Sequence, residues 1–374
     1  MTATLDMVTT AARSGLTPTQ WSSDFFEEYI RSNQFARYFG TSASSMIQLK
    51  DDLTRKPGDS VVFPTVRRLT GAGVTTGTLE GHEEALDARS LKVTVAPLRH
   101  AVSVTDWDEQ KSVIDILQAG RDALMNWALE KLRTDIIGAL GSITIDGSTS
   151  ATFAAASNAQ MDTWLTNNLD RVLFGAAVAN SVSSDFSTSI ATLDNTADLM
   201  TAATLSLAKR RARTASPHIR PIKVNNDEEW FVCFMPSLVF RDFRKDATII
   251  AAQEYAWNRG ADNPLFTSGD LLWDGCIVRE IPELPVLTAG TANAHATLDC
   301  ARSYLCGAQS VGLAWAQRTK AITNVRDYGW QHGVGVMEIR GCEKLRFGTD
   351  ATVDTTKPVD AGVYTIFTTA VGDA

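Results

Sequence analysis

Residues 56–140 contain two long alternating segments followed directly by a helical pattern, and this combination constrains the fold more than any other feature. Residues 59–69 and 91–105 are rich in Val and Thr and place apolar side chains at alternating positions, which is typical of half-buried strands. They predict a β-hairpin whose arms exceed the usual strand of about five or six residues. A compact domain cannot cover such a hairpin by itself. We therefore expect it to lie on a neighbouring copy of the chain.

The second arm changes face part of the way along. Its apolar residues occupy odd positions as far as Val95 and even positions from Leu98 onward. Because a shift of one residue exchanges the two faces of a strand, we expect a bulge or kink at Ala96 and Pro97. Between the arms, residues 70–89 combine glycines with an acidic run, which predicts a mobile tip.

The segment after the second arm has the pattern of a helix of roughly thirty residues, about 50 Å long. Asp106 and Glu109 have capping-box spacing, and Gly141 can take the left-handed conformation that ends many helices. Gly120 is either a bend point or a point of close packing against a partner. Such a helix would support an elongated part of the molecule as well as contribute side chains to the core. Its apolar stripe consists of Val113, Leu117, Leu124, Trp127, Leu132, Ile136 and Leu140.

Length, composition and charge narrow the class of protein. The chain has 374 residues, of which 44% are hydrophobic, and a net charge of -8, so two or three domains are expected. The acidic balance argues against broad nucleic-acid binding, which needs clustered positive charge. No apolar run reaches the roughly twenty residues that span a bilayer, and no signal peptide precedes the first helix, so we expect no membrane association.

The N-terminal region is expected to form an arm. Thr17, Pro18 and Gln20 mark the start of a helix. Many aromatic side chains follow, which indicates anchoring either to the chain's own body or to a neighbour. These side chains are Trp21, Phe25, Phe26, Tyr29, Phe35, Tyr38 and Phe39.

The second half mixes helices and strands without regular βαβ alternation, which indicates an α+β fold. A helix is expected over 196–214 with Leu199, Met200, Ala203 and Leu207 inward, and the cations in its last turns are either a solvated cap or a ligand patch. The run at 230–235 predicts a buried strand, followed by a short helix through Lys245. Further strands are expected at 271–281, 304–316 and 333–347.

No enzyme signature is complete. The glycines of 71–77 miss the GxGxxG spacing by one residue. His82, Glu83 and Glu84 begin like a zinc-protease helix, but Leu86 replaces the second histidine. We expect no catalytic, cofactor-binding or metal-binding residues. The cysteines are odd in number and scattered, so we expect reduced core thiols rather than disulfides: Cys233, Cys276, Cys300, Cys306 and Cys342.

Several spaced motifs in the second half resemble the major capsid protein family of tailed double-stranded DNA phages, typified by the large-virion-polymerase (N4-like) podoviruses. The likeness covers most of the chain from Thr17 to Gly348. The motifs are DRVLFG (170–175), FVCFMPSLVFRDFRKD (231–246), RGADNPLFTSGDLLWDGCIVRE (259–280), CGAQSVGLAWAQ (306–317) and RDYGWQHGVGVMEIRGCEKLRFG (326–348).

This resemblance implies the α+β capsid fold of tailed phages and herpesviruses, the HK97-like fold. Its parts are an N-terminal arm, an extended β-hairpin loop, a long spine helix, a peripheral domain and an axial domain. They map onto 1–55 as the arm, 56–105 as the extended loop, 106–141 as the spine helix, 142–318 as the axial domain with contributions to the peripheral sheet, 319–348 as peripheral-domain strands and 349–374 as a C-terminal tail.

The implied function is that of a structural protein and not of an enzyme. Hexamers and pentamers of the chain would assemble into an icosahedral head that encloses double-stranded DNA without binding it specifically. Expected partners are other copies, a portal and a separate scaffold or decoration protein, with assembly in the host cytoplasm and a final place in the virion. The candidate contacts between subunits are Trp21, Phe25, Phe26, Tyr29, Phe63, Val66, Leu69, Leu79, Leu91 and Val93.

Residues 70–89 contain no lysine, so we expect no covalent cross-link from the tip, although Lys56 and Lys92 at its base leave that chemistry open. Two other classes of function remain open from the sequence. One is the shell of a cellular, encapsulin-like nanocompartment, which would share the fold and hold enzymes in place of a genome. The other is an enzyme whose site is assembled from distant residues.

Overall fold

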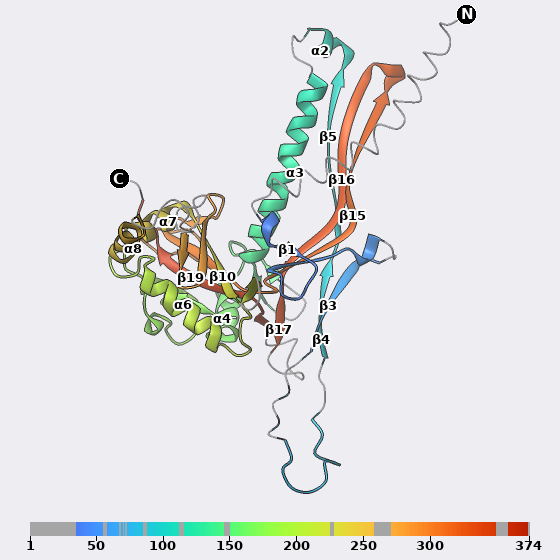
Figure 1. Cartoon of the computed structure of the whole chain (residues 1–374). Coiled ribbons are helices and arrows are strands. Elements are labelled where there is room, and N and C mark those ends of the chain that lie inside the picture. The colour runs from blue at the N-terminus through green and yellow to red at the C-terminus, as the bar shows by residue number, and fades with distance from the viewer. Residues whose placement is uncertain are drawn as a thin grey trace, which may run out of the picture.

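The computed structural model has three parts of different shape (Figure 1). A long blade, made of a five-stranded sheet and helix α3, rises from a rounded domain built on an eight-stranded sheet, and a two-stranded hairpin projects in the opposite direction. The described residues are 35–54, 58–66, 69, 71, 73–84, 88–111, 116–145, 150–224, 228–257, 271–348 and 358–372.

The blade is organised around the pairing of β15 with β16, which runs antiparallel from Val311↔Lys344 to Arg326↔Gln331. The register shifts by one residue between Trp315 and Gln317 and again between Gln317 and Lys320. Because the two shifts add up to two residues, the even-numbered residues of β15 lie on the same face of the sheet before and after the irregularity. The strands, in sheet order, are β1 (Phe39–Gly40), β2 (Ile47–Lys50), β15 (Val311–Arg326), β16 (Gln331–Lys344) and β5 (Ala96–Thr105), and the short 3-10 helices beside them are η1 (Ala36–Tyr38), η2 (Asp52–Thr54) and η5 (Asp327–Gly329).

The hairpin is shorter than the sequence predicts. β3 (Ser60–Val66) pairs with β4 (Ala88–Thr94) only. The second predicted arm breaks at Val95, and the following β5 pairs with β16 in the blade. The prediction that 59–69 and 91–105 are the two arms of one hairpin is therefore wrong for 96–105, but the change of parity expected at Ala96 and Pro97 is real. It marks the point where the chain passes from one sheet to another.

The helical segment begins one residue earlier than its predicted cap implies. The Asp108 N–H donates to Thr105 Oγ1 at 3.3 Å, so Thr105, and not Asp106, caps α2 (Asp106–Lys111). The next helix, α3 (Ile116–Leu140), ends without the predicted left-handed glycine, because Gly141 is absent from the residues with positive φ. Glycine is needed there for space, since an added Cβ would lie 2.9 Å from Tyr304 Oη.

Helix α3 packs along one face of the blade sheet and forms its core. At Gly120 an added Cβ would lie 3.1 Å from Val102 Cγ1 of β5, so this glycine allows close packing within the chain and is not needed as a bend. The Phe35 ring packs edge-on against Phe234 at 5.2 Å, which anchors the start of the described chain to its own body. The buried residues of α3 are Leu124, Ala128, Leu132, Ile136, Ile137, Ala139 and Leu140.

The rounded domain contains the second sheet. As the sequence predicts, the apolar run of β10 is a buried strand and leads through Pro236 into a short helix. The strands in order are β11 (Leu271–Trp273), β12 (Cys276–Glu280), β10 (Glu228–Met235), β14 (Cys300–Cys306), β19 (Val363–Thr369) and β8 (Val172–Phe174), with β13 (Val286–Leu287) and β9 (Ile222–Val224) paired at the side.

Helices cover this sheet, and one of them differs from its prediction. The helix predicted over 196–214 begins at Ala202, where Thr201 Oγ1 accepts the Thr204 N–H. Its inward face is also shifted, since Ala203 is exposed while Leu205 and Ala208 are fully buried. The helices are α4 (Asn158–Asn167), η3 (Val178–Asn180), α5 (Phe186–Ala191), α6 (Ala202–Thr214), α7 (Ser237–Arg244) and α8 (Ala247–Trp257).

The end of the chain is part of the core. All residues of β19 are buried, and the strand lies between β14 and β8. The expectation of a C-terminal tail over 349–374 is therefore wrong for 358–369, because 363–369 form an inner strand of the eight-stranded sheet and 358–360 pair with 346–348. The remaining short pairs are β17 (Arg346–Gly348) with β18 (Pro358–Asp360), and β6 (Ile143–Thr144) with β7 (Ser150–Ala151).

Candidate assembly surfaces

The base of the hairpin is buried within its own chain. Phe63, Leu91 and Val93 are 2%, 3% and 0% exposed and pack with Ala314 and Leu345 of the body. The prediction that these three side chains contact a neighbour is therefore wrong. Period-two alternation identified the apolar face correctly, but the chain's own blade covers it.

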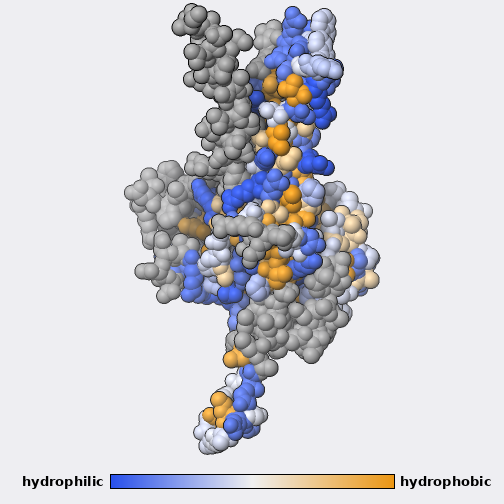
Figure 2. All heavy atoms as spheres, turned by 90° about the vertical axis from the view of Figure 1, so that its right-hand side faces the viewer, coloured by the Kyte–Doolittle hydropathy of each residue, from blue (hydrophilic) through white to orange (hydrophobic). Residues whose placement is uncertain are grey.

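The predicted contact residues near the hairpin tip are accessible. Leu69 is 55% exposed and Leu79 is 63% exposed. Apolar side chains lie among hydrophilic ones at this end of the molecule (Figure 2). Five of the predicted contacts, Trp21, Phe25, Phe26, Tyr29 and the side chain of Val66, lie outside the described residues.

The described part of the tip is glycine-dependent and acidic. Gly73, Gly77 and Gly81 have φ of 76°, 98° and 83°, a conformation that L side chains rarely adopt. Glu83 Oε2 accepts the Gly81 N–H at 2.8 Å, which fixes the local turn. Glu80 and Glu83 are both exposed. The tip thus presents negative charge beside the exposed Leu79.

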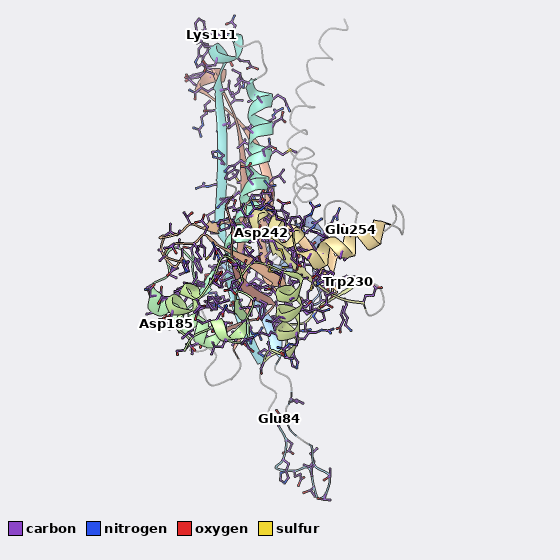
Figure 3. All side chains as sticks on the ribbon, turned by 90° about the vertical axis from the view of Figure 1, so that its left-hand side faces the viewer. Glu84, Lys111, Asp185, Trp230, Asp242 and Glu254 are labelled. Carbon is purple, nitrogen blue, oxygen red and sulfur yellow. The ribbon has the colours of Figure 1, made fainter. Side chains whose placement is uncertain are left out.

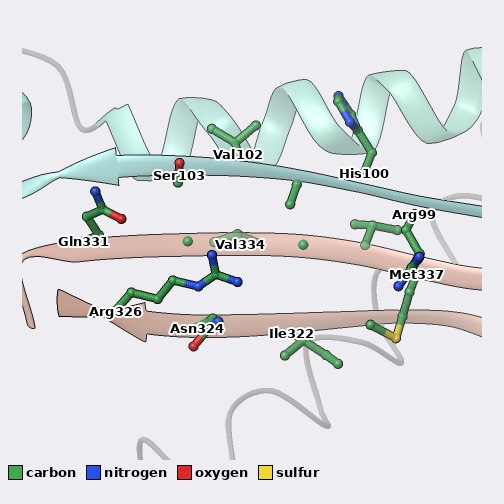
Figure 4. Close-up of a pocket in the computed structure, with 14 residues that line it drawn as sticks. Arg99, His100, Val102, Ser103, Ile322, Asn324, Arg326, Gln331, Val334 and Met337 are labelled. Atoms are coloured by element: carbon green, nitrogen blue, oxygen red, sulfur yellow. The ribbon is translucent and has the colours of Figure 1, made fainter. Parts of the chain in front are cut away.

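At the other end of the molecule, the blade carries a groove of about 660 Å³ across β5, β16 and β15 (Figure 4). Its floor is made of small residues, since Ala101 pairs with Gly335 and Ser103 pairs with Gly333 across the strands. His100 points to the opposite face, where its ring lies 4.7 Å from that of Trp127 on α3. The sequence signal for this floor is the Gly-Val-Gly-Val run at 333–336, which gives β16 one apolar face and one bare face.

Positive charge surrounds the groove. Arg99 and Arg326 line it, and no Asp or Glu is among its described lining residues. Lys320 lies on the same face, two strands from Arg99 in one cross-strand row with Met337. All three cations are exposed. No local pattern in the sequence indicates this surface, because its cations come from two distant strands, β5 and β15, that only the sheet brings together.

The far end of the blade is an exposed aromatic cluster. Tyr328, in the left-handed region at φ 51°, is fully exposed, and Trp107 and Trp330 are 52% and 48% exposed. His332 Nε2 lies 3.1 Å from Asp106 Oδ1, and the Asp106 N–H donates to Trp330 O at 3.0 Å. The second contact ties α2 to the end of the β15–β16 hairpin.

Three of the cations near the end of α6 are held by the domain itself. Lys209 Nζ lies 3.0 Å from Asp274 Oδ1, Arg211 Nη2 donates to Leu169 O at 2.7 Å, and Arg213 pairs with Glu229. These contacts connect α6 to neighbouring loops and strands. They favour the cap interpretation over a ligand patch.

The cysteines are core thiols, as the sequence predicts. All five are free, and all except Cys342 are buried. Burial raises the pKa of Cys306 and of Cys276 to about 12 and that of Cys300 to about 11, so the reactive thiolate is scarce at neutral pH. Within the described residues, no group of His, Cys, Asp or Glu has the arrangement of a metal site, and no helix is long and apolar enough to cross a membrane.

The whole architecture defines a class of protein, the shell-forming capsid subunit. This chain is similar to a chain of the capsid asymmetric unit of cyanophage Pam1, with a TM-score of 0.81 and 33% identity over 92% of this chain and 94% of that chain. It has the same fold as a chain of the capsid of Ralstonia phage GP4, with a TM-score of 0.70 and 23% identity over 91% and 92% of the two chains.

Sequence comparison gives the particular family. The chain belongs to the phage capsid protein family, which matches residues 9–372. It is also 27% identical over 376 aligned positions to the major capsid protein of Pseudomonas phage KPP25, covering 94% of this chain and 95% of that protein. The HK97-like α+β fold and the capsid function implied by the motifs are confirmed, and the enzyme alternative is wrong. The narrower likeness to large-virion-polymerase podoviruses stays a prediction.

Proposed function

We propose that this chain is the major capsid protein of a bacteriophage and that its copies form hexamers and pentamers of an icosahedral head around double-stranded DNA. The observation that carries this function is the similarity to the Pam1 capsid subunit, which extends over nearly the whole of both chains. A likeness of that extent covers far more of the chain than the rounded domain alone. A cellular nanocompartment is less favoured, because the family match is to phage capsid proteins.

Each part of the fold has a role in this proposal. The β3–β4 hairpin is the extended loop, α2 and α3 form the spine, the five-stranded sheet is the peripheral domain and the eight-stranded sheet is the axial domain. The arm expected over 1–55 would be limited to the residues before Phe35, because β1 and β2 belong to the five-stranded sheet. Repeated contacts with closed symmetry end the growth of the shell.

The other partners follow from the same proposal. A portal would occupy one vertex, and a separate scaffold or decoration protein would assist assembly. The net charge of -8 favours an inner wall to which packaged DNA does not adhere. Binding of duplex DNA by purified particles should therefore be negligible even at low ionic strength, where phosphate contacts are strongest.

Sedimentation and electron microscopy of the expressed protein would test the shell function. Closed particles of megadalton mass are expected, alone or after co-expression with the adjacent genes. A chain that stays a small oligomer under all of these conditions would contradict the proposal.

A further inference from the structure

One strand, β19, contributes side chains to three separate hydrophobic clusters. Val363 packs in the cluster that α3 forms with the blade sheet. Tyr364 and Ile366 pack in the cluster of α6 and α7, and Phe367 packs in the cluster of α4 and α5. All four side chains are at most 1% exposed. The strand therefore connects parts of the molecule that otherwise have cores of their own.

Strand β8 belongs to the eight-stranded sheet only through β19. Residues 365–367 pair in parallel with Val172–Phe174, and on the other side β19 pairs along its whole length with Cys300–Cys306 of β14. Among the described strands, no other pairs with β8. The rings of Phe174 and Phe367 are stacked 5.0 Å apart. Without β19, β8 would lose its place in the sheet and β14 would present an open edge of seven residues.

The two neighbours of β19 are attached to opposite sides of the rounded domain. Asp185, which caps α5, and Trp230, in the strand β10 that pairs with β14, lie at opposite sides of this domain in Figure 3. Between them, β19 runs through the middle of the domain (Figure 1). Its insertion therefore closes the domain, because it fills the slot between β14 and β8.

The pairing of β19 joins distant parts of the chain. Val172 and Thr365 are partners although well over a hundred positions separate them. Such pairings form slowly, because the chain must close a long loop before the contact stabilises it. Strands β10, β12 and β14 precede β19 and lie closer together in the chain. We therefore expect these three strands to pair before β19 enters the sheet.

We propose that β19 enters the sheet last and that its entry makes the chain competent for assembly. Until then the slot between β14 and β8 is open, and three clusters lack buried side chains. An open strand edge pairs readily with other chains, so a chain with an empty slot aggregates instead of joining a regular shell. Insertion of β19 thus selects closed chains for assembly. The link to assembly rests on the proposed function, whereas the order of strand insertion does not.

The native cysteines report this order in the wild-type chain. Cys300 and Cys306 are the register partners of Thr369 and Val363 in β19, whereas Cys233 lies in β10, between β12 and β14. In unassembled chain at increasing urea concentration, a thiol reagent should label Cys300 and Cys306 before Cys233, because β19 opens before the whole chain unfolds. A single urea midpoint for all three thiols would show that β19 does not open separately.

A disulfide can hold β19 in the sheet. Thr369→Cys places a thiol directly opposite Cys300 on the adjacent strand, within reach of a disulfide. Phe367→Ala removes the ring that stacks on Phe174 and weakens the insertion, so it should lower the yield of sedimenting particles about tenfold. The oxidised double variant Phe367→Ala/Thr369→Cys should recover most of the yield, and reducing agent should abolish the recovery.

The matched control removes an equally buried ring outside β19. Phe243 of α7 is 0% exposed, as is Phe367. The disulfide between residues 300 and 369 should not recover the yield that Phe243→Ala loses. Equal recovery in both backgrounds would mean that the bond stabilises the whole chain and not the insertion of β19, which contradicts the proposal. Thr369→Cys alone should assemble like the wild type, oxidised or reduced.

This proposal and the proposed function fail differently. If the wild type forms particles but Phe367→Ala assembles normally, or the disulfide gives no selective recovery, the role of β19 in assembly is wrong and the capsid function stands. If the wild type forms no particles at all, the proposed function fails. The labelling order of Cys300 and Cys306 against Cys233 then still decides whether β19 is the last strand to enter the sheet.

Discussion

Lys344 Nζ lies 2.7 Å from Asp360 Oδ2, and the two side chains are only 1% and 2% exposed. The carboxylate is fully engaged, because Trp164 Nε1 and Thr144 Oγ1 donate to it at 3.2 and 3.1 Å. Arg171 also donates to the carbonyl oxygen of Asp360 at 2.6 Å. This cluster joins the end of the blade strand β16 to α4, β6 and β18. It fixes the blade to the rounded domain at the point where the two sheets meet.

Neutralising one partner of this pair should strongly destabilise the chain. Asp360→Asn leaves the Lys344 cation buried, and Lys344→Met leaves the Asp360 carboxylate with neutral donors only. Each should cost about 3–5 kcal/mol of the free energy of unfolding, measured by urea denaturation of unassembled chain. The double variant should cost less than the sum, because it leaves no uncompensated charge.

The exposed pair of Lys92 and Asp59 at the hairpin base is the matched control. Its atoms lie 3.8 Å apart, and the side chains are 62% and 81% exposed, so solvent screens their interaction. Lys92→Met should leave the urea midpoint unchanged. A loss as large as that at Lys344 would contradict the role given to burial.

The sequence predicts those helices and strands that a short stretch of residues specifies by itself. The strand ending at Met235 and the helix that follows Pro236 were found because an apolar run and a proline suffice to specify them. The prediction of 91–105 as one hairpin arm is wrong because β5 pairs with β16, more than two hundred positions later in the chain. Alternation shows which side chains share a face. It does not show which segment covers that face, so the sequence alone cannot tell that the chain's own blade covers Phe63.

Close contact between the hairpin base and the blade depends on Gly341. A methyl group there would lie 2.1 Å from the backbone oxygen of Thr94 and 3.2 Å from Val93 Cγ1, so the hairpin base has to move. We expect Gly341→Ala to lower the free energy of unfolding by about 1–3 kcal/mol and to expose β3 and β4 to faster amide hydrogen exchange. Gly372→Ala, where nothing lies within 4 Å, is the control and should behave as wild type. Unchanged exchange in β4 would contradict this packing.

The buried thiols should be unreactive in the folded chain at pH values where free cysteine reacts. Because burial raises the pKa of Cys276 and Cys306 to about 12 from an ordinary value of 9.0, both stay protonated near neutral pH. The folded state holds these protons more tightly, so stability should fall as pH rises from about 9 toward 12 and be insensitive to these groups below that window. A thiol reagent should label Cys276, Cys300 and Cys306 only after urea is added. Rapid labelling of the native chain would contradict their burial.

Among the described candidate contacts, those that lie where the hairpin leaves the body are accessible, and their contact with a neighbour stays a prediction. Leu69 and Leu79 are exposed, whereas Leu91 and Val93 have the same apolar character and are buried. The difference lies in Gly312 and Gly341, whose missing side chains let the hairpin base settle on the blade. The groove is not predictable from local sequence for a related reason. Arg99, Lys320 and Arg326 are unremarkable as separate residues, and only the pairing of three strands places them around one surface.

Removing the hairpin tip should separate folding from assembly. Deleting residues 70–85 leaves 67–69 and 86–87 to connect β3 and β4, which suits a short hairpin loop. The buried base, with Phe63 and Leu91 against Ala314, stays intact, so the free energy of unfolding should change little. Because the part that can reach another copy is gone, we expect soluble capsomers and no stable heads by sedimentation and electron microscopy. An equal number of glycine and serine residues in place of 70–85 keeps the length and removes the acidic and apolar groups, and this variant should also fail to assemble if the side chains matter. Normal heads from the deletion would show that the tip is dispensable.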